Sequence, residues 1–249
     1  MIKLIRGILI IGFVTAIGVS GYQFWQIQSG YQHERAVYNT VVQFKPVLPK
    51  LPSIETEEKE AFFNQDILDL QAKYEDAVGW ITVPNTGIDY PFVQAADNSF
   101  YLRKDITGEY ALTGTIFMDC RNDKGFADFN TILYGHHMKN GTMFGSLKSF
   151  NNKDFFLANN EGTIFLADRT YAIEFFAYLI VRHNDDIIYG VPSDNAERLN
   201  YINHVKETAR HYIDIGVAPA DQIITLSTCA YEFKNARMVL IGKISDQLS

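Results

Sequence analysis

QIITLSTCAYEFKNARMVLIGKI, residues 222–244, has the pattern of two strands joined by a short loop. It opens with a β-branched run and closes with a second apolar run, while residues 230–236 are of mixed character. Two such runs predict an antiparallel hairpin. Cys229 would end the first strand and Arg237 would begin the second, so we expect their side chains to be neighbours.

This pairing would give Cys229 the surroundings of a nucleophile. A fixed positive charge nearby favours the thiolate, which is the reactive form of a cysteine. The guanidinium of Arg237 can also stabilise the oxyanion that forms when the sulfur attacks a carbonyl. On the hairpin alone, however, a buried structural cysteine and a solvated arginine are the commoner situation.

A second segment, TILYGHHMKNGTMFGSL (131–147), supports the catalytic interpretation. A short apolar strand leads to Gly135, and His136 and His137 follow at the turn. A catalytic cysteine needs a histidine partner, which can be distant in sequence. Successive side chains of an extended chain point to opposite faces, so only one of the two histidines can face the sulfur. Cysteine, histidine and arginine at strand ends together predict an acyl-transfer site.

These motifs resemble the sortase family of cysteine transpeptidases. The resemblance rests on TLSTC with a downstream Arg, and on LYGHHM and TMFGSL upstream. Three more segments resemble class B members: WITVPNTGIDYPFVQ (80–94), DNSFYL (97–102) and GTIFMDCRN (114–122). The match runs in collinear order from about residue 77 to 244, and its TLxTC–Arg signature with an upstream Gly-His is specific. In this family the histidine directly follows the glycine, which selects His136 and leaves His137 a surface or packing role.

The resemblance implies a membrane-anchored transpeptidase with His136, Cys229 and Arg237 as catalytic residues. Cys229 would attack the carbonyl of a Thr in the C-terminal sorting signal of a surface protein, and Arg237 would stabilise the oxyanion. Protonated His136 would give its proton to the departing amine. An amino group of a peptidoglycan precursor would then resolve the thioacyl enzyme. No metal or organic cofactor is implied.

The peptide groove can be assigned only by resemblance. Four residues match positions that contact sorting peptides in the family: Asn98, Leu102, Tyr134 and Ser227. Some class B members have an acidic residue directly after the cysteine and a longer loop before the arginine. Here Ala230 follows Cys229 and the loop is short, so the sorting motif of those members does not carry over.

Three alternatives remain beside cell-wall anchoring. A pilin-polymerising sortase would use a Lys amine of another pilin as acceptor, and a hydrolytic cysteine peptidase would use the same three residues with water. Papain-like enzymes place the cysteine before the histidine, the opposite of the order here. A membrane-tethered adhesion domain would leave all three residues without a role.

The N-terminus has the pattern of a membrane anchor. Lys3 and Arg6 precede an uncharged stretch, residues 7–25, and some twenty helical residues span about 30 Å, the thickness of a hydrocarbon core. The positive charges predict a cytoplasmic tail (1–6), a transmembrane anchor (7–26) and an extracellular remainder. A cleaved signal peptide would have a shorter apolar run. Residues 27–54 contain three prolines and are predicted to be a spacer before the catalytic domain, residues 55–249.

Short apolar segments separated by turn residues dominate from Gly79 onward. With the two strands of the hairpin they make about eight, which predicts a mainly β fold and a closed eight-stranded sortase-like barrel. The other expected strands are 80–83, 90–93, 115–118, 131–134, 163–166 and 171–181.

Two helices are expected to accompany the barrel. An N-terminal helical extension would be capped by Thr56 and present Phe63, Ile67, Leu70 and Tyr74 on one face. A long helix inserted before the nucleophile strand would start at Asp194, with Leu199, Ile202, Val205, Ala209 and Tyr212 on one face.

Composition excludes other classes of function. The chain has 249 residues and a net charge of −7, without a basic patch, so nucleic acid is not an expected partner. The two cysteines, Cys120 and Cys229, are expected to be free thiols, because a disulfide would consume the nucleophile. The sequence contains neither CxxC nor HExxH, so no zinc site is indicated.

Overall fold

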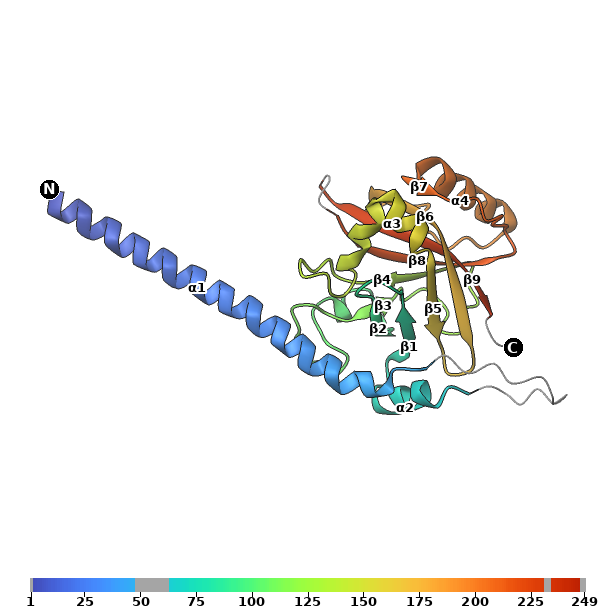
Figure 1. Cartoon of the computed structure of the whole chain (residues 1–249), viewed down its shortest axis with the longest axis horizontal. Coiled ribbons are helices and arrows are strands. Elements are labelled where there is room, and N and C mark those ends of the chain that lie inside the picture. The colour runs from blue at the N-terminus through green and yellow to red at the C-terminus, as the bar shows by residue number, and fades with distance from the viewer. Residues whose placement is uncertain (1, 48–62, 231–233, 247–249) are drawn as a thin grey trace.

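The computed structural model describes residues 2–47, 63–230 and 234–246. A long helix, α1 (Ile2–Val41), projects from a β-barrel that contains most of the remaining described chain (Figure 1). The N-terminus lies at the free end of this helix, far from the barrel.

Eight strands close the barrel, as the sequence predicted. The hydrogen-bonded order is β5-β1-β2-β3-β4-β8-β9-β6, and pairing of β6 with β5 completes the ring. Each strand expected from sequence is present, with ends that differ by a few residues. The bounds are β1 (Ala77–Thr82), β2 (Asp89–Val93), β3 (Ile116–Met118), β4 (Asn130–Tyr134), β5 (Glu161–Phe165), β6 (Thr170–Arg182), β8 (Gln222–Cys229) and β9 (Ala236–Asp246).

Alternating side chains of the long strands form two hydrophobic clusters. On β6, Tyr171, Ile173 and Phe175 point into the barrel, where they join residues such as Phe92 and Leu226. Phe176, Ala177, Leu179 and Val181 of β6 lie on the outer face beneath the helix α4 (Asn195–Thr208). Burial on both faces explains why β6 is apolar along almost its whole length.

The helix before the nucleophile strand is shorter than predicted. Asp194 caps α4 as expected, because its carboxylate accepts from the backbone N–H groups of Ala196 and Glu197. The helix ends at Thr208, however, and Tyr212 belongs to a short strand, β7 (His211–Tyr212), that pairs with β6. Leu199 is half exposed and does not join the apolar face. Tyr201 takes its place against the barrel.

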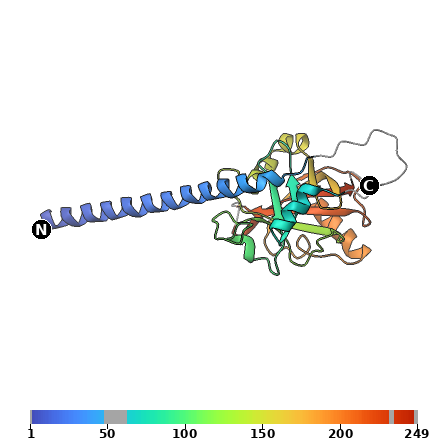
Figure 2. The same ribbon diagram turned by 90° about the horizontal axis from the view of Figure 1, so that it is seen from below.

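The helical extension begins later than expected. Helix α2 (Gln65–Lys73) is capped by Asn64, whose side chain accepts from the backbone N–H of Ile67. Thr56, the predicted cap, lies outside the described residues. Phe63 precedes the helix and is exposed, so its predicted packing role was wrong. Ile67, Leu70 and Tyr74 are buried as expected, next to the end of α1 (Figure 2).

The predicted spacer is largely helical. Residues 27–41 continue α1 without interruption, and η1 (Val42–Phe44) follows. This stretch contains no proline, since the first proline of the chain is Pro46, and one of its faces packs on the barrel. An irregular spacer was therefore the wrong prediction for residues 27–44. Residues 48–54 lie outside the described part of the chain.

Shorter elements complete the fold. They are η2 (Phe100–Leu102), η3 (Gly145–Asn151) and α3 (Lys153–Ala158). The first of these carries Leu102, one residue of the predicted peptide groove, to the rim of the barrel.

Candidate active site

The ends of three adjacent strands bring the predicted catalytic residues together. β8 pairs in parallel with β4 and antiparallel with β9. Cys229 is the last residue of β8 and lies opposite Arg237 on β9. His136 follows the end of β4, where the backbone N–H of Gly135 donates to the carbonyl of Ser227 over 3.2 Å. The topology thus places thiol, imidazole and guanidinium at one rim of the barrel.

A cavity of about 510 Å³ opens at this rim. Every residue that the sequence assigned to the site lines it: Asn98, Leu102, Tyr134, His136, Ser227, Cys229 and Arg237. Three of them come from β8 and β9, two from the β4 end, and two from residues 98–102. Segments more than 100 residues apart in sequence thus share one cavity.

The ring of His136 is held by a backbone carbonyl. Its Nε2 lies 2.7 Å from the carbonyl oxygen of Leu102, and a carbonyl can only accept, so Nε2 carries a proton. The other ring nitrogen, Nδ1, remains for proton exchange. Burial lowers the pKa of His136, the bond to Leu102 opposes that shift, and the charge of Arg103 adds to it. Burial therefore favours the uncharged form of the imidazole.

The structure places His137 outside this cavity. Its Nδ1 donates to the backbone carbonyl of Cys229 over 2.9 Å, and its side chain lines a separate hollow together with Met138 and Met238. The contact supports the backbone of the cysteine from the far side. It does not bring the imidazole to the cavity that holds His136.

The side chain of Arg237 is half-buried, and the residue lies opposite Cys229. One guanidinium nitrogen, Nη1, donates to the carbonyl of Ala236 over 3.2 Å, which orients the planar group. The backbone N–H of Ala230 donates to the carbonyl of Ala236 over 2.9 Å and closes the hairpin on the strand side of the loop. Residues 231–233 of that loop lie outside the described part of the chain.

One wall of the cavity is built on a buried carboxylate that sequence reasoning missed. Asp119 is fully buried and accepts from Nε and Nη2 of Arg121, both at 2.8 Å, and from the hydroxyl of Tyr134 at 2.9 Å. Burial alone would raise the pKa of Asp119, but these hydrogen bonds hold it below its usual value. The carboxylate therefore stays ionised and fixes the Tyr134 side chain.

The same arginine ties the wall to the loop before α4. Nη2 of Arg121 also donates to the carbonyl of Tyr189 over 3.0 Å. The Tyr189 hydroxyl lies 2.8 Å from Oγ of Ser227, and its ring stacks on Tyr134 with centroids 6.3 Å apart. Asn98 is fixed separately, because its Oδ1 accepts from the backbone N–H of Cys120 at 2.8 Å. Two aromatic rings and two polar side chains thus form a preorganised surface beside Cys229.

Neither cysteine forms a disulfide, in agreement with the sequence. Among the residues that the structure describes, no group of three or more His, Cys, Asp or Glu is arranged to hold a metal ion.

Comparison with known proteins gives consistent matches. A family model described as "Sortase domain" matches residues 81–245. Sortase B of Listeria monocytogenes is 38% identical over 72% of this chain and 74% of its own length. Sortase B of Staphylococcus aureus is 30% identical over 93% of both chains. A crystal structure of sortase B from B. anthracis in complex with AAEK1 covers 88% of this chain and 99% of its own, with a TM-score of 0.75 and 31% identity.

Proposed function

Because the chain belongs to the sortase family and is a transpeptidase of the sortase B kind, we propose the following chemistry for it. It cleaves a C-terminal sorting signal after Thr and joins the carboxyl group to an amine of a peptidoglycan precursor. The observation that supports this most is the shared cavity of Cys229, His136 and Arg237. Each side chain comes from a different strand end, and together they offer the nucleophile, the acid–base group and the oxyanion donor that acyl transfer uses.

The first half-reaction forms a thioester. The Cys229 thiolate attacks the Thr carbonyl carbon, a C–S bond forms, and the negative charge moves to the carbonyl oxygen. Arg237 donates to that oxyanion. Nδ1 of protonated His136 gives its proton to the departing amide nitrogen, and the C–N bond breaks. The bond from Nε2 to the Leu102 carbonyl stays in place throughout and keeps the ring oriented.

The second half-reaction reverses these roles. The incoming amine attacks the thioester carbonyl, Arg237 again holds the oxyanion, and neutral His136 accepts a proton from the amine at Nδ1. The C–S bond breaks and the thiolate returns. The lowered pKa of His136 suits it to act as the base in this step.

We assign peptide recognition to the part of the cavity wall that Asn98, Leu102, Tyr134 and Ser227 line. Tyr134 and Ser227 present their side chains beside Cys229, and Asn98 and Leu102 line the adjoining end of the cavity. The stacked Tyr134 and Tyr189 rings offer an apolar face, while their hydroxyls are already occupied by Asp119 and Ser227. The peptide would therefore meet rigid side chains whose hydrogen bonds need no rearrangement.

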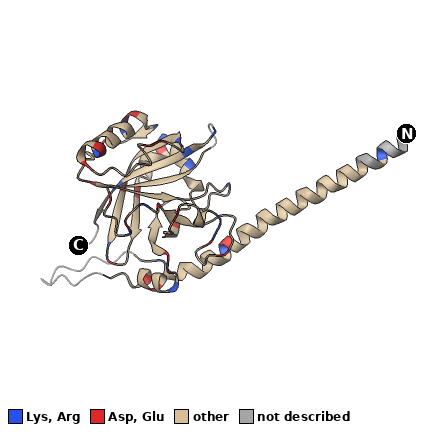
Figure 3. Ribbon diagram, turned by 180° about the vertical axis from the view of Figure 1, so that it is seen from behind, with Lys and Arg blue, Asp and Glu red and all other residues tan. Residues whose placement is uncertain are grey.

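We place the enzyme at the cell membrane with its catalytic domain outside. Residues 10–28 of α1 are exposed, and this part of the helix is long and apolar enough to cross a bilayer. Figure 3 shows charged residues near its N-terminus and at its barrel end, with none between. This supports a cytoplasmic tail (1–6), an anchor (7–26) and an extracellular domain, by the excess of positive charge on the N-terminal side.

A chain that lacks residues 1–26 is expected to be soluble and to keep its peptide-cleaving activity. The part of α1 that packs on the barrel starts near Gly30, so this deletion removes exposed helix only. Solubility without detergent, circular dichroism and peptide cleavage would check the prediction. An insoluble product that has also lost its β-sheet signal would show that the anchor is not separable.

The acyl enzyme itself is the most direct test of the proposed function. We expect a panel of sorting peptides to yield, by mass spectrometry, an adduct on Cys229 whose mass ends at Thr. Adding an amine should convert this adduct to an amide product. Release of the free acid at the same rate with and without amine would indicate a hydrolytic peptidase, and preference for a pilin Lys would indicate pilus assembly.

A further inference from the structure

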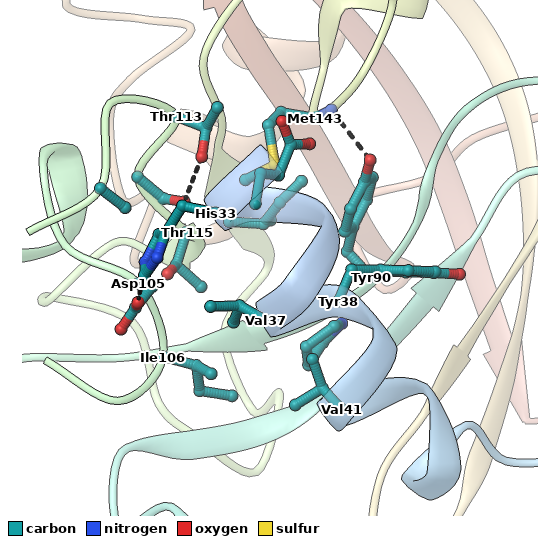
Figure 4. A pocket seen from close by; sticks show the side chains of 15 residues that line it. His33, Val37, Tyr38, Val41, Tyr90, Asp105, Ile106, Thr113, Thr115 and Met143 are labelled. Atoms are coloured by element: carbon teal, nitrogen blue, oxygen red, sulfur yellow. Dashed lines mark hydrogen bonds and ion pairs between the residues drawn. The ribbon is translucent and has the colours of Figure 1, made fainter. Parts of the chain in front are cut away.

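The last three turns of α1 pack against the barrel through one face (Figure 4). We call this the docked face, and its residues recur at helical spacing. They are Gly30, His33, Glu34, Val37, Tyr38 and Val41. Across a narrow apolar pocket the docked face meets three barrel side chains, Tyr90, Asp105 and Met143. A helix needs no such contacts to cross a membrane, so the docked face must be explained by what it contacts on the barrel.

The first contact fixes the loop formed by residues 103–115. Nε2 of His33 lies 2.8 Å from Oδ2 of Asp105, whose side chain is 6% exposed. The other oxygen of Asp105 accepts from the backbone N–H and the hydroxyl of Thr107, at 2.8 and 2.6 Å. Gly30 adds a close approach, since a Cβ there would lie 3.2 Å from the Leu112 side chain. One carboxylate thus joins the helix to the turn of this loop.

This loop in turn supports the carbonyl that binds His136. Gly114, with φ at +60°, lies so close to residues 101 and 102 that a Cβ would be 2.7 Å from the Leu102 oxygen. The backbone N–H of Thr115 donates to the carbonyl of Tyr101, and its hydroxyl to that of Lys104. The Leu102 carbonyl therefore has a fixed position when it accepts from Nε2 of His136 at 2.7 Å.

The second contact fixes the loop formed by residues 136–145. The Tyr38 ring meets the Tyr90 ring edge to face at 5.6 Å, and the Tyr90 hydroxyl accepts from the backbone N–H of Met143 at 3.3 Å (Figure 4). One residue further on, Phe144 donates to the backbone carbonyl of His136 over 3.1 Å.

We propose that the docked face of α1 positions His136 through two loops. Residues 103–115 support the carbonyl that binds its ring, and residues 136–145 begin with His136 itself. The inference rests on the proposed function, because it takes His136 as the proton carrier. His33 orients the loop that supports the Leu102 carbonyl, and Tyr38 orients, through Tyr90, the loop that begins at His136. The helix that leaves the membrane is thus continuous with the support of the catalytic histidine. Full activity requires α1 to be docked.

A double variant tests this in the full-length protein in detergent micelles. His33→Ala with Tyr38→Ala removes one contact to each loop. We expect kcat for peptide cleavage to fall about 10- to 100-fold with KM unchanged, because small misplacement of a catalytic group has an effect of that size. The rate at which a small electrophile alkylates Cys229 should not change, since the cysteine lies on β8 and not on either loop.

Two matched variants separate positioning from loss of stability. His33→Lys with Tyr38→Phe supplies an N–H donor for Asp105 and a ring for Tyr90, so it should recover most of kcat. Gln32→Ala with Asn39→Ala changes the exposed face of the same turns and should behave as wild type. An equal loss of kcat in this exposed pair, or no recovery in the conservative pair, would overturn the proposal.

NMR of the His136 ring needs no substrate, so it tests the positioning role of α1 separately from the proposed function. The NMR resonances of the His136 ring should shift in the alanine pair, and its pKa should move up toward the ordinary value, because looser loops admit water. Unchanged His136 resonances would overturn the positioning role. If the wild-type protein cleaves no sorting peptide, the proposed function fails, yet these resonances still decide whether α1 positions the histidine.

Discussion

Replacing His136 with alanine is expected to abolish turnover, whereas His137→Ala should retain most of it. His136 lines the cavity with Cys229 and is the proposed proton carrier in both half-reactions. Loss of a positioned acid–base group typically lowers a rate by roughly 100- to 10,000-fold. Steady-state cleavage of a sorting peptide by both variants would measure this contrast.

The expected effect of His137→Ala follows from its contact with the backbone of the cysteine. The substitution removes the hydrogen bond from Nδ1 to the Cys229 carbonyl, which lies at a partly solvated site. Such a bond contributes about 1 kcal/mol, which corresponds to roughly a fivefold change. Losses of equal size in the two histidine variants would mean that the proton carrier has been assigned to the wrong ring. Cys229 alkylation in both variants serves as the control for intact folding.

The hairpin shows why much of this site could be predicted from sequence. A nucleophile at the end of one strand and an arginine at the start of the next are neighbours whenever the two strands pair antiparallel. Only the register remains to be fixed, and the apolar runs leave it open because β8 is buried on both faces. In the structure the register places Cys229 opposite Arg237.

The barrel wall could not be predicted in the same way. Asp119 and Arg121 belong to GTIFMDCRN (114–122), a segment whose only signal in the sequence is its resemblance to class B sortases. Arg121 joins this wall to Tyr189, which is 68 positions away in the sequence. The two residues meet only because the loop before α4 folds over the rim. The one local pattern is an acidic and a basic residue two apart at the end of a buried strand. That pattern usually marks a solvated turn.

The docked face of α1 was missed for a different reason. The prolines that suggested a spacer all follow residue 45, while the docked face lies before them. His33 and Glu34 lie among the apolar residues of the docked face. Its composition is therefore that of a solvent-exposed helix face. Its partners lie at residues 90–143, and pairing across such a distance leaves no local trace in the sequence.

Arg237→Lys is expected to lower kcat for peptide cleavage by roughly 100- to 1,000-fold, the loss found when one oxyanion donor is removed. Lysine keeps the positive charge but not the planar fork of donors. In the structure Nη1 of Arg237 already donates to the carbonyl of Ala236, which turns the guanidinium into a fixed orientation beside Cys229. An ammonium group on a flexible stem cannot satisfy that carbonyl and an oxyanion together.

The alkylation rate of Cys229 separates the two possible roles of this arginine. If Arg237 served mainly to keep the thiolate ionised, lysine would supply the same charge and turnover would stay near normal, which would contradict the oxyanion assignment. If it binds the oxyanion, turnover falls in Arg237→Lys while a small electrophile still alkylates Cys229 at the wild-type rate, because alkylation develops no oxyanion. Greatly slowed alkylation in the lysine variant would instead assign the arginine to the thiol. The oxyanion role therefore requires both results in one protein, a large loss of turnover and an unchanged reactivity of the sulfur.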